Sequence, residues 1–300
     1  MKVRHCILIA SALMLSWSLK AQESVPANEV FEFLSFPRGV AQMGMAGAGS
    51  TLLNESTAMA AFGNPAVLPL ALGRVDAAVQ YGRWAPAQEY TLSNNLGGGV
   101  SVRLGKGFAV SASVISQAHA ISLNDLIIAV GAGVSLGEHL SVGVSARMVQ
   151  QTILEDTKLS STAFTAMLQY HKAGLNVAAG VANLGSGVKS ESEVTSSLPS
   201  SARLAGSYEL PAGPGVLTCA LDADYFFSGK LGISAGVVYG FNELIFVRVG
   251  YRYASTGCAF PSHLALGLGA KWKGFGLDVS YITANKQVGN SICIGASYGF

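Results

Sequence analysis

The stretch SICIGASYGF, residues 291–300, decides the fold of this chain. Its even-numbered positions, from Ile292 to Phe300, are all apolar or aromatic, whereas its odd-numbered positions are Ser, Cys or Gly. Successive side chains of a β-strand point to opposite faces, so a period of two predicts a strand with apolar surroundings on one face only. We therefore expect the chain to be built from strands of this kind.

The same stretch resembles the C-terminal signal of bacterial outer-membrane barrels, in which the closing strand ends on an aromatic residue. Tyr298 and Phe300 occupy the aromatic positions of that signal. The resemblance implies that residues 291–300 form the strand that closes a barrel, and that assembly takes place in an outer membrane.

The composition favours the same class of protein. Of the 300 residues, 50% are hydrophobic and only 12% are charged, whereas soluble domains carry about 25% charged residues. After the N-terminus, Gly, Ser, Thr and Asn interrupt every apolar run, which excludes spanning helices of about 20 residues. Many short alternating segments are what a transmembrane β-barrel requires. The net charge of +2 includes no basic run, so no nucleic-acid partner is expected.

The N-terminus carries an export signal. Lys2 and Arg4 precede an apolar core at 6–17, and residues 18–21 suit a cleavage site, which predicts a signal peptide over residues 1–21. Three cysteines then remain, Cys219, Cys258 and Cys293. Their spacing excludes a disulfide framework and a cysteine metal site, although a single bridge stays open.

Residues 22–73 have a different pattern from the rest. A glycine-rich run at 43–49 precedes a helix that we expect over 54–62, and Asn64-Pro65 should end it, because a residue before proline avoids helical geometry. The segment is too apolar for a free tail and too irregular to span a membrane. We expect it to form a plug, or hatch, inside a barrel made by residues 74–300.

Parts of this region resemble the PorV/PorQ family. The resemblance rests on FEFLSFPR at 31–38, MGMAGAG at 43–49, Asn64-Pro65-Ala66, and the loop-to-strand entry at 198–208. That family consists of outer-membrane barrels similar in fold to the FadL long-chain fatty-acid transporters, which also carry an Asn-Pro-Ala element at the end of an N-terminal hatch. The resemblance implies a FadL-like barrel for this chain.

Alternating segments predict about fourteen antiparallel strands in an all-β barrel. They lie near residues 74–84, 96–104, 108–118, 125–136, 139–154, 161–170, 175–184, 202–210, 215–227, 230–241, 244–254, 263–272, 275–284 and 290–300. Tight connections fall at every second junction, which is the asymmetry of outer-membrane barrels with short periplasmic turns. The junction at 228–229 departs from this rule, because it is short where a long loop is expected.

The alternation also assigns charged side chains to the lumen. A charged side chain that faces lipid at the membrane midplane costs about 2–4 kcal/mol, and a position that points into the barrel avoids this cost. The polar residues that we expect to face the lumen are Arg147, Arg203, Asp222, Asp224, Arg248, Arg252 and Asp278. Asp222 and Asp224 could oppose Arg248 and Arg252 across a polar passage or ligand site. The favoured alternative is that these charges pair with one another and with the plug, since buried charges need partners.

Nothing in the sequence predicts catalysis. His119, His139, His171 and His263 fall at strand ends on different faces, which favours solvated turns over a catalytic pair. Gly-x-Gly steps lie within alternating strands, so they do not indicate a nucleotide loop. We expect no enzymatic activity, no cofactor and no metal site.

Two functions follow from the family resemblance. PorV- and PorQ-like proteins work with the type IX secretion machinery of Bacteroidota, which implies a carrier or binding platform for secreted proteins in the outer-membrane lipid. The alternative is a FadL-like transporter of small hydrophobic compounds, for which a lateral opening at a broken strand would be diagnostic. The entry at 31–38 favours the secretion role, and an accessory barrel within a larger surface complex is a third hypothesis.

Overall fold

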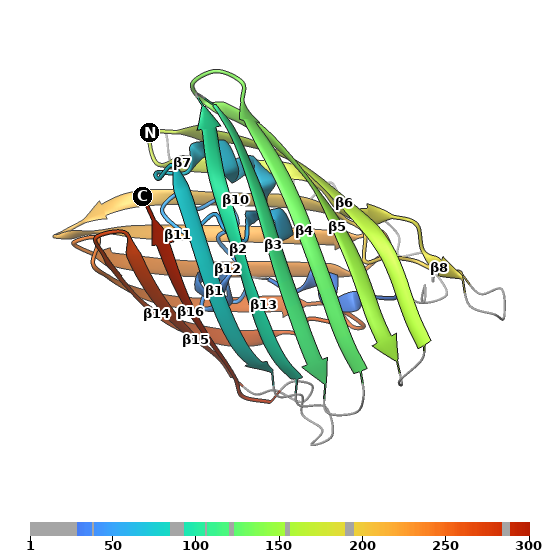
Figure 1. Cartoon of the computed structure of the whole chain (residues 1–300). Coiled ribbons are helices and arrows are strands. Elements are labelled where there is room, and N and C mark those ends of the chain that lie inside the picture. Colours follow the sequence, from blue (N-terminus) through green and yellow to red (C-terminus); the bar gives the residue numbers. More distant parts are fainter. Residues whose placement is uncertain are drawn as a thin grey trace.

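The computed structural model of the chain describes residues 29–37, 39–84, 93–105, 107–119, 123–153, 157–189, 195–283 and 289–300 (Figure 1). The expected signal peptide over 1–21 and Arg38 lie outside these residues. Fourteen strands form a closed barrel in which the paired neighbours are antiparallel. The predicted fold class, an all-β antiparallel barrel of fourteen strands, is confirmed.

The barrel strands follow one another around the wall in chain order. They are β1 (Val75–Trp84), β2 (Ser93–Gly105), β3 (Phe108–His119), β4 (Leu123–Ser135), β5 (Leu140–Ile153), β6 (Thr157–Lys172), β7 (Leu175–Gly185), β10 (Ser201–Ala212), β11 (Gly215–Phe226), β12 (Leu231–Phe241), β13 (Ile245–Ala254), β14 (His263–Trp272), β15 (Phe275–Ile282) and β16 (Ser291–Gly299). Two short strands, β8 (Val188–Lys189) and β9 (Thr195–Ser196), form a separate two-stranded sheet.

The closing stretch forms the seam of the barrel. Strand β16 pairs with β15 on one side and with β1 on the other. Beyond the strand, the N–H of Phe300 donates to the carbonyl of Val75, and its own carbonyl accepts from the N–H of Val75. The Tyr298 ring lies 4.4 Å from that of Phe275 and 5.6 Å from that of Phe300. Backbone pairing and an aromatic cluster therefore both hold the last strand in place.

The two ends of the barrel differ in their connections. We call one the turn end, because it carries tight turns at 136–139, 173–174, 213–214, 242–244 and 273–274, the two-residue junction between β2 and β3, the start of β1 and the end of β16. The opposite end, which carries mostly longer connections, is the loop end. The short junction at the loop end is a real turn: Gly229 has φ +84° and its N–H donates to the carbonyl of Phe226. The strands on either side of this turn therefore pair directly with each other, and no strand is missing between them.

The outer surface is apolar and has aromatic residues toward both ends. Exposed aliphatic side chains alternate with buried inward residues, as in Ile245, Val247 and Val249 of β13. Exposed aromatic residues near the loop end include Tyr81, Tyr225, Phe227, Tyr251 and Tyr253, and those near the turn end include Phe241, Trp272, Phe275, Tyr298 and Phe300. An apolar band between two aromatic belts is the surface that a bilayer requires.

Residues 29–73, which we call the inner segment, lie within the barrel (Figure 1). The segment contains η1 (Glu32–Ser35), α2 (Val40–Met43), η2 (Ala60–Phe62) and η3 (Pro65–Leu70). It starts at the loop end, where the N–H of Val30 donates to the carbonyl of Ser197, and it reaches the turn end before β1. None of the described helices is long or apolar enough to span a membrane.

The helix expected over 54–62 is largely wrong. Only residues 60–62 are helical, in a 3-10 turn. Ser56 donates its hydroxyl to Asp76 on the wall, and the N–H of Thr57 donates to the same carboxylate. These groups would otherwise cap or continue a helix. Contacts with the barrel therefore replace the local hydrogen bonds that the sequence pattern suggested.

The wall is interrupted at few points in the part of the chain that is described. The pairing register shifts near the turn end between Arg103 and Gly105, and again between β6 and β7. At the second point, Ala182 and Asn183 together oppose Thr165 in a β-bulge, and Asn183 has φ +58°. Both residues of the bulge are buried. The bulge thus turns an extra side chain inward, and the described strands show no wider break that would serve as a lateral opening.

Candidate functional site

The inner wall fits the backbone of the inner segment closely. A Cβ atom added to Gly143 would lie 2.2 Å from the carbonyl carbon of Pro65, and one added to Gly250 would lie 2.2 Å from that of Met45. At Gly99 the distance to the carbonyl oxygen of Ala58 would be 2.4 Å. These positions carry glycine because the segment approaches the wall at backbone distance.

Inward charges bind the backbone of this segment. The Asp222 carboxylate accepts from the N–H groups of Gly49, at 2.8 Å, and Ser50, at 3.2 Å. Arg203 pairs with Asp224 at 2.7 Å and also donates to the carbonyl of Gly63 at 3.2 Å. Hydrogen bonds from charged groups are stronger than those between neutral groups. These side chains therefore anchor the segment to β10 and β11.

Arg147 holds the middle of the inner segment. Its guanidinium donates to the carbonyls of Ala61, at 3.2 Å, and Phe62, at 2.8 Å, where the 3-10 turn ends. It also donates to the side chain of Asn183 at 2.7 Å, and Asn183 in turn donates to the carbonyl of Pro199 at 3.1 Å. The bulge in β7 thus links the segment to the long connection at the loop end.

A second charged cluster lies toward the turn end. Arg248, only 1% exposed, pairs with Asp278 and with Glu55, both at 2.7 Å, and Lys271 pairs with Glu55 at 3.2 Å. Burial raises the pKa of Glu55, but the Lys271 and Arg248 cations outweigh this effect, so the pKa lies below the ordinary value of a glutamate. Glu55 therefore stays ionised and ties the segment to β13 and β14.

The four charges that we expected to oppose one another do not pair directly. Asp222 binds backbone N–H groups, and Asp224 pairs with Arg203. Arg252 donates to the hydroxyl of Ser234 at 3.0 Å and to the carbonyl of Phe260 at 3.2 Å. In the structure these charges hold the segment and neighbouring strands.

The Asn64-Pro65-Ala66 element links two parts of the segment to the wall. The side-chain oxygen of Asn64, Oδ1, accepts from the N–H of Ala66 at 3.0 Å and caps η3. Its amide nitrogen donates to the carbonyl of Ser50 at 3.1 Å and to Gln169 on β6 at 2.7 Å. Pro65 occupies the first turn of η3, where its missing N–H costs nothing.

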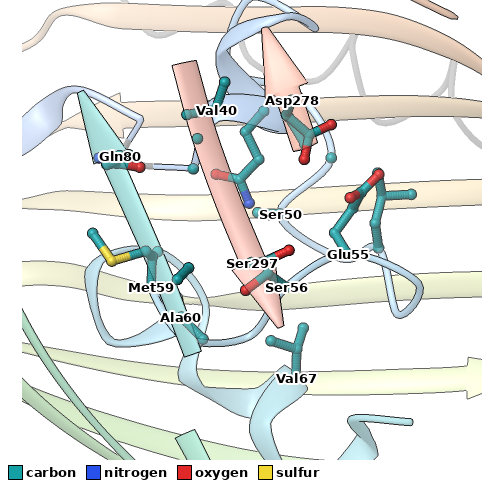
Figure 2. Close-up of a pocket in the computed structure, with 18 of the residues that line it drawn as sticks. Val40, Ser50, Glu55, Ser56, Met59, Ala60, Val67, Gln80, Asp278 and Ser297 are labelled. Carbon is teal, nitrogen blue, oxygen red and sulfur yellow. The ribbon is translucent and has the colours of Figure 1, made fainter. Parts of the chain in front are cut away.

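A cavity of about 80 Å³ lies between the inner segment and the seam of the barrel (Figure 2). Figure 2 shows lining side chains from the segment, such as Val40 and Met59, together with Gln80 from β1 and Ser297 from β16. Ala78 and Gly295 leave room on the wall. The cavity thus has a mixed polar and apolar lining, and it borders the seam.

A more open cavity of about 400 Å³ lies at the turn end. Its lining includes residues 53–57, Asp76 and residues 271–276. Glu55, Ser56 and Ser297 line both this cavity and the enclosed one. Residues 55–56 therefore separate the two spaces, and they are held by Arg248, Lys271 and Asp76 as described above.

Groups typical of catalysis do not gather at these cavities. No cluster of three or more His, Cys, Asp or Glu side chains that could hold a metal occurs among the residues that are described. His263 is buried and its Nδ1 lies 2.8 Å from the carbonyl of Pro261, so the solvated position expected for it is wrong. Cys219, Cys258 and Cys293 are free thiols.

Comparison with solved structures identifies the fold. The chain is similar to the toluene transporter TbuX of Ralstonia pickettii, with a TM-score of 0.65 and 12% identity over 88% of this chain and 98% of that one. The fold is FadL-like. The monoaromatic hydrocarbon channel CymD has a TM-score of 0.66 and 14% identity over 88% of this chain and 98% of that one. A Pseudomonas aeruginosa FadL homologue has a TM-score of 0.59 and 11% identity over 91% of this chain and 100% of that one.

Comparisons of sequence alone add no family. The chain matches no protein-family model. No curated protein matches it either. Membership of the PorV/PorQ family therefore stays a prediction that rests on the motifs quoted above.

Several residues of the site were not predicted from the sequence. Gln169 and Asn183 lie on the inward row but are uncharged, and Glu55 and Ser56 were assigned to a helix. Asp76 lies near the start of the first strand and could have been found from the same alternation that identified Asp278. The alternation along each strand predicts inward positions for uncharged polar residues as well as for charged ones.

Proposed function

We propose that this FadL-like barrel is an outer-membrane passage for small molecules with apolar character, with its turn end in the periplasm. The observation that carries the proposal is the enclosed cavity between the inner segment and the barrel seam. Solved barrels of the same fold are a toluene transporter and a monoaromatic hydrocarbon channel, which supports a small-molecule role. Residues 22–73 act as the plug of the passage, and residues 74–300 form its wall.

In this proposal the described conformation is closed. A cavity of about 150 Å³ holds benzene in an engineered protein, whereas the enclosed cavity here measures about 80 Å³. A molecule of that size requires the inner segment to move. The segment is fixed both by polar contacts and by four clusters of buried apolar side chains that it shares with the wall. Residues 54–57 belong to none of these clusters, and their polar contacts to the wall can exchange with water.

Residues 55–56 form the barrier that must move. They separate the enclosed cavity from the one at the turn end. Arg248 and Lys271 hold Glu55 in this position, and Asp76 holds Ser56. Release of these contacts would join the two cavities. The route then runs along the seam between β16 and β1.

Uptake by cells tests the passage. In a Gram-negative host that lacks its own FadL-type protein, the chain should raise the uptake rate of radiolabelled toluene or a similar small aromatic compound. Ala78→Phe fills the enclosed cavity and should reduce this gain at least roughly fivefold, the factor that about 1 kcal/mol represents. Ala77→Phe, on the outward face of the same strand, is the matched control and should leave uptake unchanged. Uptake equal to that of cells without the chain, at equal membrane levels, refutes the passage.

The secretion role predicted from the PorV/PorQ resemblance is the competing hypothesis. Its support is the sequence entry at 31–38 and the glycine-rich run at 43–49. A pull-down of the tagged protein from native outer membranes in mild detergent separates the two functions. Co-purification of secretion components, or of secreted proteins sharing a C-terminal sorting domain, supports the carrier role. A bound apolar small molecule without a protein partner supports the passage.

A further inference from the structure

A group of polar side chains lies buried on the inner wall at the loop end without protein partners. Ser93 and Asn95 face inward from β2, and Gln117 faces inward from the neighbouring β3, with exposed fractions of 4%, 2% and 4%. Within the part of the chain that the structure describes, the hydroxyl oxygen of Ser93, both side-chain amide atoms of Asn95 and the side-chain oxygen of Gln117 have no hydrogen-bond partner. Asn95 and Gln117 are paired directly across the two strands.

Such an arrangement is costly for a wall that serves only to enclose. Each buried polar group that lacks a partner costs about 1–3 kcal/mol. Elsewhere on the inner wall, comparable side chains bind the backbone of the inner segment, as Ser113 does with the carbonyl of Ala58 at 2.9 Å. Single hydroxyl groups elsewhere on the described wall, those of Ser111, Ser145 and Ser201, also lack partners, but at the loop end four unpartnered atoms lie together on two neighbouring strands.

The group continues the enclosed cavity toward the loop end. Gln80 lines that cavity and is paired with Gly97 on β2. Asn95 is the next inward residue on β2, about 7 Å further along the strand, and it is paired with Gly82, which carries no side chain. Hydrogen-bonding groups thus extend along β1 and β2 from the cavity to the loop end.

An apolar layer lies next to this polar group. Ile115, the inward residue that precedes Gln117 on β3, is fully buried in a cluster with Phe31 and Met59. Met59 also lines the enclosed cavity. A molecule that reaches both layers would place an apolar body against Ile115 and Met59 and a polar group against Asn95.

Charge near the group disfavours an anionic ligand. Asp125 on β4 is paired directly with Gln117 across the sheet, and its carboxylate accepts from the amide of Gln151 at 2.8 Å. Among the described inward residues of β2–β4 at this level, Asp125 is the only charged one. A carboxylate or phosphate head group would therefore meet a like charge, whereas a neutral hydroxyl or amide would not.

We propose that Ser93, Asn95 and Gln117 bind the polar head of a small, neutral, amphipathic molecule whose apolar body lies against Ile115 and Met59. This rests on the proposed passage and assigns its preferred substrate class. A neutral hydroxyl or amide compound is preferred both to a plain hydrocarbon and to a carboxylate of the same size.

Three probes that share one apolar body and differ in one substituent test this preference. Binding of para-fluorobenzyl alcohol, para-fluorotoluene and para-fluorobenzoate to the full mature protein in lipid nanodiscs is measured by fluorine NMR, with protein-free nanodiscs subtracted. The alcohol should bind at least roughly fivefold more tightly than either other probe, the factor expected for one added hydrogen bond. Asn95→Leu should remove this advantage and leave binding of the hydrocarbon unchanged.

Control variants separate the site from general effects on folding. Asn94→Leu changes the outward neighbour on the same strand and should leave all three affinities unchanged, and Asn95→Gln, which keeps an amide, should retain part of the preference. Equal or tighter binding of the hydrocarbon or the benzoate by the unaltered protein overturns the inference while leaving the passage intact. If none of the probes binds and none is taken up by cells, the passage itself fails.

Discussion

At the scale of single residues, Glu55 has a larger part than its sequence context suggested. It is the one residue of the inner segment that pairs with two cations of the wall in the described structure, Arg248 and Lys271. Loss of the Glu55 charge would leave Lys271 without its anionic partner and Arg248 paired with Asp278 alone, at a cost of several kcal/mol. The protonation state of one side chain should therefore control the barrier between the two cavities.

The barrier should respond to pH through Glu55. Because its pKa is lowered in the folded protein, Glu55 stabilises the closed barrier at every pH above the ordinary glutamate value of about 4.3, and this contribution is lost only as the pH falls through the lowered pKa. Ion conductance in planar bilayers should stay low from about pH 7 to about pH 5 and rise only below about pH 4. Asp278 is the other acid that faces Arg248.

Glu55→Gln provides the control for this effect. The amide cannot ionise, so the variant should conduct at every pH in this range, and its conductance should no longer depend on acid in the same way. If the conductance of the unaltered protein rose already between about pH 7 and about pH 6, the titrating group could not be a carboxylate with a lowered pKa. That result would contradict the role of Glu55.

At the scale of elements, the inner segment is held at many points by groups of the wall. Hydroxyl groups of the wall bind the segment between Arg248 at one side of the barrel and Arg147 at the other, as Ser141 does with the carbonyl of Ala66 at 2.7 Å. Each bond is modest, about 1 kcal/mol, but the set fixes one position of the segment. Movement of a short part, residues 53–57, requires fewer of these bonds to break than movement of the whole.

A disulfide should therefore lock the barrier. The hydroxyl groups of Thr57 and Ser101 lie 2.7 Å apart, one on the segment and one on β2. The variant Thr57→Cys/Ser101→Cys, made with the native cysteines replaced, should lose at least roughly fivefold of the uptake gain when oxidised and recover it on reduction. The single variant Thr57→Cys, under the same redox conditions, should show no change. Full uptake by the cross-linked protein would place the route elsewhere.

At the scale of the whole molecule, closure of the barrel depends on its last strand. Strand β16 bonds to both neighbours, and Phe300 extends its pairing to the start of β1. An open edge would expose unpaired backbone groups to lipid, where each costs several kcal/mol. The closing strand therefore has a larger effect on assembly than any single loop.

Deletion of Phe300 tests this dependence. The fraction of protein that migrates as a heat-modifiable barrel from outer membranes should fall at least roughly threefold, because both the aromatic contact and the backbone bonds to Val75 are lost. Deletion of one residue from 190–194, between β8 and β9 in the sequence, is the matched control and should have little effect. Equal losses would show that the chain end has no special part in closure.

Much of this architecture could be predicted because a barrel strand is specified locally. In residues 291–300 the apolar side chains on the face of Ile292 alternate with small ones on the face of Cys293, and other strands repeat this pattern. The pattern depends only on lipid at one face of the strand and the lumen at the other. For this reason the fourteen strands and even the short junction at 228–229 agree with the structure. The helix expected over 54–62 failed because its capping groups found partners on the wall.

The sequence by itself determined the barrel, its number of strands and which side chains face inward, since these follow from a period of two along each strand. Only the tertiary structure decided what the inward groups do. Asn64 meets Gln169, Asp222 meets Gly49 and Arg248 meets Glu55. These partners are far apart in sequence, and their choice depends on how the inner segment lies against a closed wall. The same packing leaves the cavity at the seam and the unpartnered side chains beside it, which no local pattern specifies.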